Sequence, residues 1–416
     1  MGWTAVNFPF EQREVKTLVA LLLLSFAIRV VLFPLPGYEK VDTRDFISWF
    51  NIAAENGPRT FYNPPNWCDY PPLNVYIFWG FGSLAKALSL FGTSLIRYMV
   101  KLPPSLFDIA MAFLIFAFVR KRLNFKTSLL VTALYAFNPA VIFNTAVWGQ
   151  YDAIYTFFLV LSLMLVFSSK PKLSAVAFTL GLLTKPQSIA LAPLIAFLIF
   201  KKHGWRKLLI SLLVAVATIF AVIIPFEWAN PVDFLANIYF GAYGGYKFTT
   251  VNAFNLWALG GLWRPDTQTF LFLSLSITGW IMFGALAVFA LYVLHKRFGA
   301  SRELLVLFSA FVLFFGFFML PTRIHERYLF PTLGVLALMF SFFNKIRPVY
   351  GILSLTCLVN QAYVLHFLNN GQFIQAGDPV VWIVTLINLI AFLYVLVIMW
   401  RELRGNSWFS LVRLEA

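Results

Sequence analysis

The apolar run TLVALLLLSFAIRVVLFPLPG at residues 17–37 indicates a membrane protein. The run is long enough to cross a hydrocarbon core of about 30 Å, with Arg29 as its one charged residue. It ends in PLPG rather than in a small-residue cleavage site, so we expect a retained anchor. Across all 416 residues, hydrophobic side chains make up 60% and charged ones only 12%. Soluble domains carry about 25% charged residues, so the composition predicts an all-α polytopic membrane protein.

Thirteen apolar runs can be traced, and the positions of Lys and Arg predict the side on which each one ends. They begin near residues 17, 73, 102, 127, 153, 173, 188, 208, 269, 304, 328, 348 and 379. If the run at 73–91 crossed the membrane, the basic stretch 120–126 would face outward, against the positive-inside rule. Gly80, Gly82 and Lys86 also weaken this run. We therefore expect about twelve transmembrane helices, with both termini cytoplasmic.

These boundaries predict a single integral membrane domain over residues 1–416. Its other features are a long first external loop at 37–97, a second at 227–268 and a short cytoplasmic tail at 401–416. The apolar run 173–200 is interrupted by TKPQS at 184–188. We expect two short helices that meet at a buried break, because irregular backbone at membrane depth must be lined by protein or water.

Charge and cysteine usage exclude two other classes of protein. The net charge of +15 comes without a basic helix or an aromatic RNA-binding platform. We attribute it to the positive-inside bias and to attraction for anionic lipid, and expect no nucleic-acid partner. Cys68 and Cys357 cannot form a disulfide framework, and neither has the spacing of a metal ligand.

Three acids on the predicted external side are candidate catalytic residues. Asp42 opens DTRDFISWF, where it is a helix N-cap with Asp45 in the first turn, a carboxylate base at the membrane surface, or both. A helix N-terminus would lower its pKa, and Trp49, two turns along, would cover it. Asp69 in CDYPPL is a cap or a catalytic acid. Asp152 after WGQY is a solvated acid in an aromatic belt or part of the site.

Basic residues on the same side are candidate phosphate ligands. Lys185 in the TKPQS break either snorkels to lipid headgroups or binds a phosphate, since an ammonium at that depth needs a partner. The turn TRIHERY at 322–328 holds Arg323, His325, Glu326 and Arg327, which either clamp phosphate oxygens or meet headgroups. One histidine without HExxH spacing argues against zinc.

Other polar residues fall outside these two groups. Asp108 lies inside a span with Arg29 as its obvious partner, and a functional role and a structural ion pair are both open. Asn252 and Asn255 in the second long loop are either loop caps or hydrogen-bond partners of a sugar.

The order of these motifs resembles a known family. An acid seven residues before Trp49, then DYPPL, then HERYLFP, resembles the GT-C family of polyprenyl-phosphate-sugar-dependent glycosyltransferases. The likeness is greatest to the dolichyl-phosphate-glucose glucosyltransferases of N-glycan assembly and to prokaryotic relatives of GPI mannosyltransferase II. WGQYD, LLTKPQ and VNAFNLWAL also look like the prokaryotic group, so the resemblance covers residues 42–331. It implies a bundle whose first external loop contains two interfacial helices.

The resemblance also implies roles for single residues. The family's general base corresponds to Asp42, its second loop acid to Asp152 and its DYPP acid to Asp69. His325 and Glu326 match an HE pair near the donor. The remaining match is a Lys-Gln element at Lys185 and Gln187, which Pro186 separates here.

The chemistry fits such an enzyme. A sugar on a lipid phosphate already has a good leaving group, so displacement at the anomeric carbon needs a base and cations for the departing phosphate. We expect an inverting transferase that moves a hexose, mannose or glucose, from a polyprenyl- or dolichyl-phosphate donor to a lipid-linked glycan or another external acceptor. No cofactor and no tightly bound metal are expected. Asp69 or Asp152 as a second acid leaves hydrolysis open.

The expected location is the plasma membrane of a prokaryote, or the ER membrane if the chain is eukaryotic, with the site on the external or lumenal face. The alternative function is a twelve-span transporter or lipid flippase, in which the TKPQ break would form the binding site. No internal repeat supports it. The sugar, the acceptor and the linkage are left open by the sequence.

Overall fold

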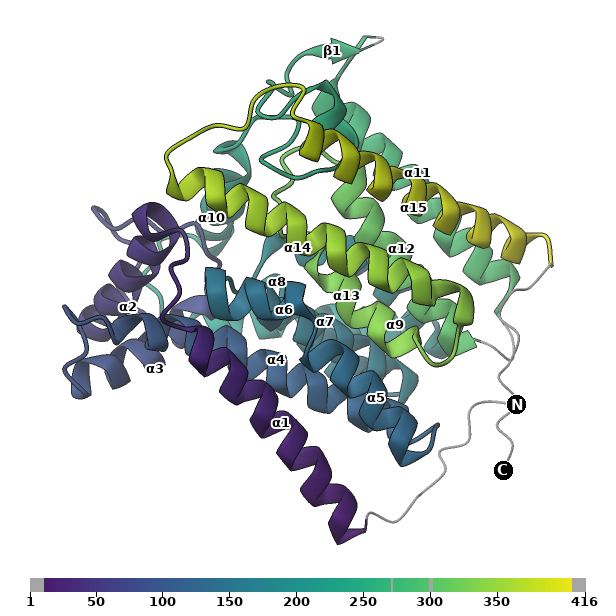
Figure 1. Ribbon diagram of the computed structural model, residues 1–416, viewed down its shortest axis with the longest axis horizontal. Coiled ribbons are helices and arrows are strands. Elements are labelled where there is room, and N and C mark those ends of the chain that lie inside the picture. The colour runs from purple at the N-terminus through teal and green to yellow at the C-terminus, as the bar shows by residue number, and fades with distance from the viewer. Residues whose placement is uncertain (1–10, 271, 299–301, 406–416) are drawn as a thin grey trace.

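The computed structural model describes residues 11–270, 272–298 and 302–405, most of them in helices. The α-helices are α1 (Gln12–Leu32), α2 (Arg44–Asn56), α3 (Leu73–Ala87), α4 (Ile96–Arg120), α5 (Phe125–Ala136), α6 (Pro139–Ile142), α7 (Asp152–Phe167), α8 (Pro171–Leu182), α9 (Ala192–Ile223), α10 (Pro231–Gly244), α11 (Leu275–Lys296), α12 (Arg302–Met319), α13 (Phe330–Met339), α14 (Arg347–Asn369) and α15 (Pro379–Leu403). Figure 1 shows most of the long helices side by side in one bundle. The all-α prediction is confirmed.

Short elements join these helices. They are the π-helical turns η1 (Glu39–Thr43) and η2 (Phe143–Trp148), the 3-10 turns η3 (Pro186–Leu191), η4 (Leu256–Gly260) and η5 (Asn344–Ile346), and the strands β1 (Thr269–Phe270) and β2 (Leu273–Ser274). The two strands pair antiparallel, with Thr269 opposite Ser274.

Among the described residues, six helices are long and apolar enough to cross a membrane. They are α1, α4, η3 with α9, α11, η5 with α14, and α15; α5 and the α6–η2 segment make a seventh if counted as one span bent by 44°. Helices α7, α8, α12 and α13 are apolar but shorter. Gly204, at φ 80°, divides α9 into two parts. Helices occur at all twelve predicted positions if the two parts of α9 are counted separately. That all twelve cross the membrane, and the side on which each ends, stay predictions.

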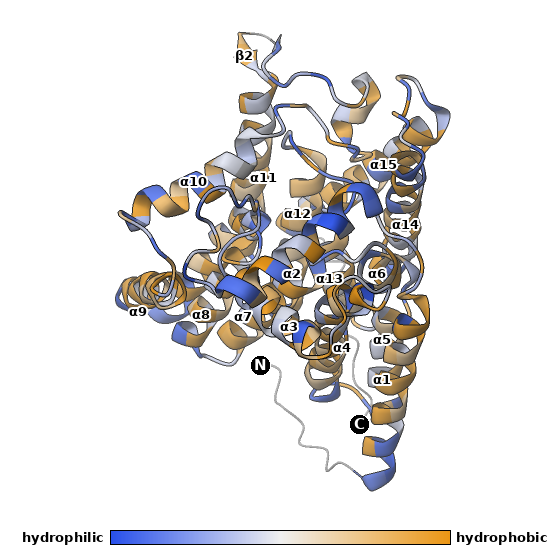
Figure 2. Cartoon of the chain, turned by 90° about the vertical axis from the view of Figure 1, so that its left-hand side faces the viewer, coloured by the Kyte–Doolittle hydropathy of each residue, from blue (hydrophilic) through white to orange (hydrophobic). Residues whose placement is uncertain are grey.

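Helices α12 and α13 form the centre of the bundle. Nearly all their side chains are buried, including Phe311, Phe315 and Leu336. By contrast α1 and α9 are mostly exposed. Figure 2 shows apolar residues along the bundle helices and polar residues gathered in the loops around them. A polar side chain near α13 is consequently shielded from water.

The segment 37–97 contains two helices, α2 and α3, that pack on each other. With 15 residues, α3 is about 22 Å long, against about 30 Å for the hydrocarbon core. Aromatic rings join the pair to the bundle: Phe46 of α2 stacks on Tyr151, the residue before α7, with ring centroids 4.7 Å apart. The start of α7 is therefore fixed from the side of this loop.

The predicted break between α8 and η3 is present. Lys185 has an extended backbone, at φ −148° and ψ 135°, between the two helices. The first turn of α3 holds the break in place, because the Leu73 amide donates to the Leu183 carbonyl at 3.0 Å. The Asn74 side-chain amide donates to the Thr184 carbonyl at 2.7 Å.

A glycine pair on α3 tests the α2–α3 packing. A Cβ at Gly82 would overlap the backbone carbonyl of Phe50, whereas Gly80 has nothing within 4 Å. We expect Gly82→Ala to cost about 1–3 kcal/mol through overpacking and to lower the apparent unfolding temperature in detergent. Gly80→Ala gains about 0.5–1 kcal/mol of helix propensity and raises it. Equal stability of the two variants would contradict the close packing.

Candidate active site

Asp42 lies in η1 and accepts two hydrogen bonds on one carboxylate oxygen. The indole N–H of Trp148 and the side-chain amide of Gln150 both donate to its Oδ2 at 2.7 Å. The expectation of an N-cap is wrong, because Thr43 precedes α2 and no side chain caps that helix. The indole N–H of Trp49 donates instead to the Trp67 carbonyl. Asp42 is thus held by residues from a distant segment.

The segment WGQYD places both donors. Gly149 is in the left-handed region at φ 85° and reverses the chain between Trp148 and Gln150. The hydroxyl of Tyr70 donates to the Gln150 Oε1 at 3.4 Å, which turns the amide nitrogen toward Asp42. A Cβ at Gly37 would lie 2.6 Å from the Trp148 carbonyl, so this turn and the loop before η1 are in close contact.

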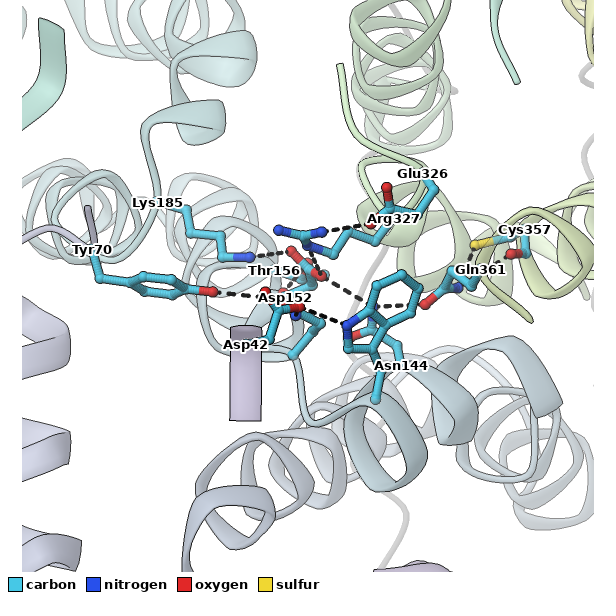
Figure 3. Close-up of polar contacts among 12 residues, drawn as sticks. Asp42, Tyr70, Asn144, Asp152, Thr156, Lys185, Glu326, Arg327, Cys357 and Gln361 are labelled. Atoms are coloured by element: carbon cyan, nitrogen blue, oxygen red, sulfur yellow. Dashed lines mark hydrogen bonds and ion pairs between the residues drawn. The ribbon is translucent and has the colours of Figure 1, made fainter. Parts of the chain in front are cut away.

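Asp152 and Lys185 form a buried ion pair. The Lys185 Nζ lies 2.7 Å from the Asp152 Oδ1, and the side chains are 6% and 0% exposed. Asp152 is therefore not a solvated acid, and Lys185 does not snorkel toward headgroups. The Asn144 amide donates to the Asp152 Oδ2 at 3.0 Å, and Arg327 Nε lies 3.9 Å from the same oxygen. Figure 3 shows these side chains meeting beside Asp42.

The turn 322–328 divides its basic residues between two places. Arg327 pairs with Glu326 at 2.5 Å and reaches Asp152. Arg323 instead pairs with Asp266 of the second long loop at 2.7 Å and donates to the Tyr243 carbonyl. The sequence predicted that the basic residues of this turn clamp phosphate oxygens together. Arg323 is not placed to do so, because it already has the buried acid Asp266 as its partner.

The remaining predicted residues differ in their surroundings. The ring of His325 contacts those of Tyr246 and Tyr328, with centroids 5.1 and 5.2 Å away. Gln187 has a buried Oε1 without a hydrogen-bond partner among the described residues. Asn252 accepts from the Trp263 indole at 2.7 Å.

Asn255 is a structural cap. It accepts from the Trp257 amide at the start of η4 and donates to the Phe318 carbonyl at 3.0 Å. Its side chain is fully buried. Of the two interpretations open from sequence, the contacts favour the loop cap.

Burial changes the pKa values of the acids at this site. It raises the pKa of Asp42, while the Arg327 charge and the hydrogen bond from Trp148 oppose the rise; the lowered pKa expected from a helix N-terminus is wrong. Burial also raises the pKa of Glu326, against Arg327. Desolvation, with the nearby Arg327 and Lys185 charges, lowers the pKa of His325 well below its ordinary value, so the imidazole is neutral.

Asp69 is the acid with the weakest set of partners. Its Oδ1 is buried without a hydrogen-bond partner among the described residues. Burial raises its pKa to about 6, with a further rise from Asp42 and opposition from Arg327 and Lys185. It is not a helix cap, since Pro72 precedes α3.

The Arg29–Asp108 pair lies apart from this site, within the helices. Arg29 Nε is 3.3 Å from the Asp108 Oδ2, and both side chains are fully buried. The hydroxyls of Tyr135 and Thr145 also donate to Asp108, at 3.0 and 2.6 Å. These contacts favour the structural interpretation of the pair.

No group of three or more His, Cys, Asp and Glu side chains is placed to hold a metal ion within the part of the chain that the structure describes. The expectation of no bound metal stays a prediction.

The comparison with known families agrees with a sugar-transferring membrane enzyme. A family model described as dolichyl-phosphate-mannose-protein mannosyltransferase matches residues 69–228, less than half of the chain. The matched part includes Asp69, Asp152 and Lys185 but neither Asp42 nor Arg327. This match supports a membrane glycosyltransferase. No curated protein matches the chain significantly.

The ion pair at the centre can be tested by a double-mutant cycle. Lys185→Met leaves the Asp152 carboxylate buried without its ammonium, so we expect a loss of about 3–5 kcal/mol in unfolding free energy. Asp152→Asn leaves the Lys185 ammonium buried without its carboxylate, so it should also lower the free energy of unfolding. The double variant should lose less than the sum of the two, measured by unfolding in detergent.

A surface ion pair provides the control. Arg44 pairs with Asp45 at 3.0 Å, but its side chain is 69% exposed. Arg44→Met should cost under about 1 kcal/mol. Additive losses in the Asp152–Lys185 cycle would contradict the pairing.

Asp69 predicts a pH dependence of stability. The folded-state pKa of Asp69, about 6, exceeds the ordinary 3.8. Its carboxyl group therefore stabilises the folded protein below pH 3.8, and this stabilisation is lost as the pH rises through about 6. We expect Asp69→Asn to become progressively more stable relative to the unsubstituted protein between about pH 4 and 7. Thermal unfolding of both proteins across this range measures the difference, and a constant difference would contradict the raised pKa.

Proposed function

We propose that the protein is an inverting hexosyltransferase that moves mannose or glucose from a polyprenyl- or dolichyl-phosphate donor to a lipid-linked glycan or another external acceptor. One observation carries this proposal. The Asp42 carboxylate, with one oxygen free of hydrogen bonds from the described residues, stands beside the buried Lys185 and the partly buried Arg327 (Figure 3). The family match over residues 69–228 supports the same donor chemistry.

The roles follow from the reaction. Asp42 takes the proton of the acceptor hydroxyl while the acceptor oxygen bonds to the anomeric carbon. The bond from this carbon to the phosphate oxygen breaks, and its electron pair leaves with the phosphate. Lys185 and Arg327 stabilise the charge on the departing phosphate, and Asp152 holds both cations in position. The departing group needs no proton, so no general acid is required.

Other predicted residues take supporting roles in this proposal. Neutral His325, Glu326, Gln187 and Asn252 line the donor side. Asp69, with its raised pKa, is a second acid near Asp42 rather than the base. Arg323 and Asn255 are assigned to holding the second long loop, because their partners are Asp266 and the Phe318 carbonyl.

The proposal includes a location and a set of partners. The protein acts as an integral membrane enzyme, in a prokaryotic plasma membrane or a eukaryotic ER membrane, with the site at the external or lumenal face and both termini cytoplasmic. Its partners are the lipid-phosphate sugar, the acceptor and surrounding lipids, without a tightly bound metal or another cofactor.

The transporter or flippase alternative rested on the broken helix at 184–188. That break is present, but Lys185 within it is paired with Asp152. Movement of a lipid-phosphate sugar across liposomes without any product would favour this alternative.

Substitution of Asp42 tests the proposed base. With synthetic farnesyl-phosphate mannose and glucose as donors and a lipid extract as acceptor source, product mass reports the transfer. Asp42→Asn should lower kcat by about 10²–10⁴-fold, because the amide cannot take the proton.

Asp45→Asn is the matched control, since Asp45 lies three residues on and its carboxylate pairs with Arg44 instead. It should retain activity. Full activity of Asp42→Asn would refute the assignment.

A further inference from the structure

Both donors to Asp42 use the same oxygen. We propose that Trp148 and Gln150 are positioning residues that hold Asp42 through its Oδ2, so that its Oδ1 is the atom that takes the proton from the acceptor hydroxyl. The inference rests on the proposed function and goes beyond it by assigning the reacting atom and the residues that orient it.

The hydrogen bonds divide the carboxylate into a bound and a free oxygen. The Trp148 Nε1 and the Gln150 Nε2 each lie 2.7 Å from Oδ2. An ionised carboxylate has about two acceptor sites on each oxygen, so the two donors saturate Oδ2. No group of the described residues donates a hydrogen bond to Oδ1. The lone pairs that remain for an incoming hydroxyl are therefore on Oδ1.

The donors themselves are rigid. Trp148 is 2% exposed and packs in an apolar cluster with Phe254 and Ala258. Gln150 is 1% exposed, and the Tyr70 hydroxyl on its Oε1 fixes which end of the amide faces Asp42. Rotating the carboxylate to exchange its oxygens would break both 2.7 Å bonds. The orientation of Asp42 is thus set before any substrate binds.

The same two bonds counteract the cost of burial. Hydrogen bonds to a charged carboxylate favour its ionised form, and the bond from Trp148 lowers the pKa that burial raises. The other charged or titratable groups that interact with Asp42 are Arg327, Lys185, Asp45, Asp69, Glu326, Tyr38, Tyr70 and Tyr246. Replacing Trp148 leaves all of these side chains in place, and replacing Gln150 removes only the hydrogen bond from Tyr70. Loss of either donor therefore raises the pKa of the base.

Two tryptophans of the chain form a matched pair for the experiment. Trp148 and Trp49 are both buried, and each indole N–H makes a 2.7 Å hydrogen bond. Only the acceptor differs: the Asp42 carboxylate for Trp148 and the Trp67 carbonyl for Trp49. Comparing Trp148→Phe with Trp49→Phe therefore separates the hydrogen bond to Asp42 from the general effect of losing an indole.

The measurement is the pH profile of sugar transfer, with whichever farnesyl-phosphate sugar gives product in the Asp42 experiment. For Trp148→Phe and Gln150→Leu, we expect the acid limb of kcat/KM to move up by about one pH unit. At pH 7, kcat should fall roughly tenfold to a hundredfold, because the base is no longer oriented. The KM for the donor should stay unchanged, since the phosphate ligands are intact.

Two further variants complete the set. Tyr70→Phe, which keeps the aromatic ring but frees the Gln150 amide, should give a smaller shift in the same direction. Trp49→Phe should keep both the acid limb and kcat.

The outcomes separate this inference from the proposed function. If Asp42→Asn is inactive but the acid limb of kcat/KM does not move in Trp148→Phe and Gln150→Leu, the inference alone is overturned. A lower kcat in these variants without a shift of the acid limb overturns it too. Activity in Asp42→Asn overturns the proposed function and the inference with it. If Trp148→Phe is not recovered as folded protein, Gln150→Leu and Tyr70→Phe decide the question by the same profile.

Discussion

The site depends on one buried ion pair, between Lys185 and Asp152. A charge removed from water costs several kcal/mol unless a partner and hydrogen bonds compensate for it. Besides Lys185, Asp152 has a hydrogen bond from Asn144 and a second cation, Arg327, near the same oxygen. Segments that are far apart in the chain must therefore meet at this point: the start of α7, the break after α8, the η2 turn and the turn before α13. The polar centre of an otherwise apolar bundle follows from this requirement.

Acids outnumber cations around this ion pair. Asp42, Asp69, Asp152 and Glu326 surround two cations, Lys185 and Arg327. Burial raises the pKa of three of these acids, which reduces the negative charge that the centre must carry. A phosphate that arrives at Lys185 and Arg327 meets cations already held in place, so little side-chain freedom remains to be lost on binding.

The parts that could be predicted from the sequence are those that local physics determines. An acid and an arginine in two apolar spans must pair, as Asp108 and Arg29 do. A polar TKPQS inside an apolar run must break the helix, and it does. The spacing of Lys and Arg argued against 73–91 as a span, and α3 is only 15 residues long, although its place relative to the membrane stays a prediction. Each of these conclusions needed only composition and spacing.

What the sequence could not provide were the contacts between distant segments. Trp49 was expected to cover Asp42 because it is near in the chain, but the indole that bonds to Asp42 is that of Trp148, 106 residues along the sequence. Arg323 was grouped with Arg327, although Asp266 of an aperiodic loop neutralises it. The one available signal was WGQYD, where a tryptophan, a glycine and an amide precede an acid. Its partner could be found only in three dimensions.

The two hydrogen bonds from α3 to the break have a further consequence. Leu73 and Asn74 are bonded to the carbonyls of residues 183 and 184, directly before Lys185. A helix of 15 residues is thereby linked to Lys185, which carries the buried positive charge. A displacement of α3 relative to the bundle pulls on the peptide that carries Lys185. The geometry of the candidate site is thus mechanically coupled to the position of α3.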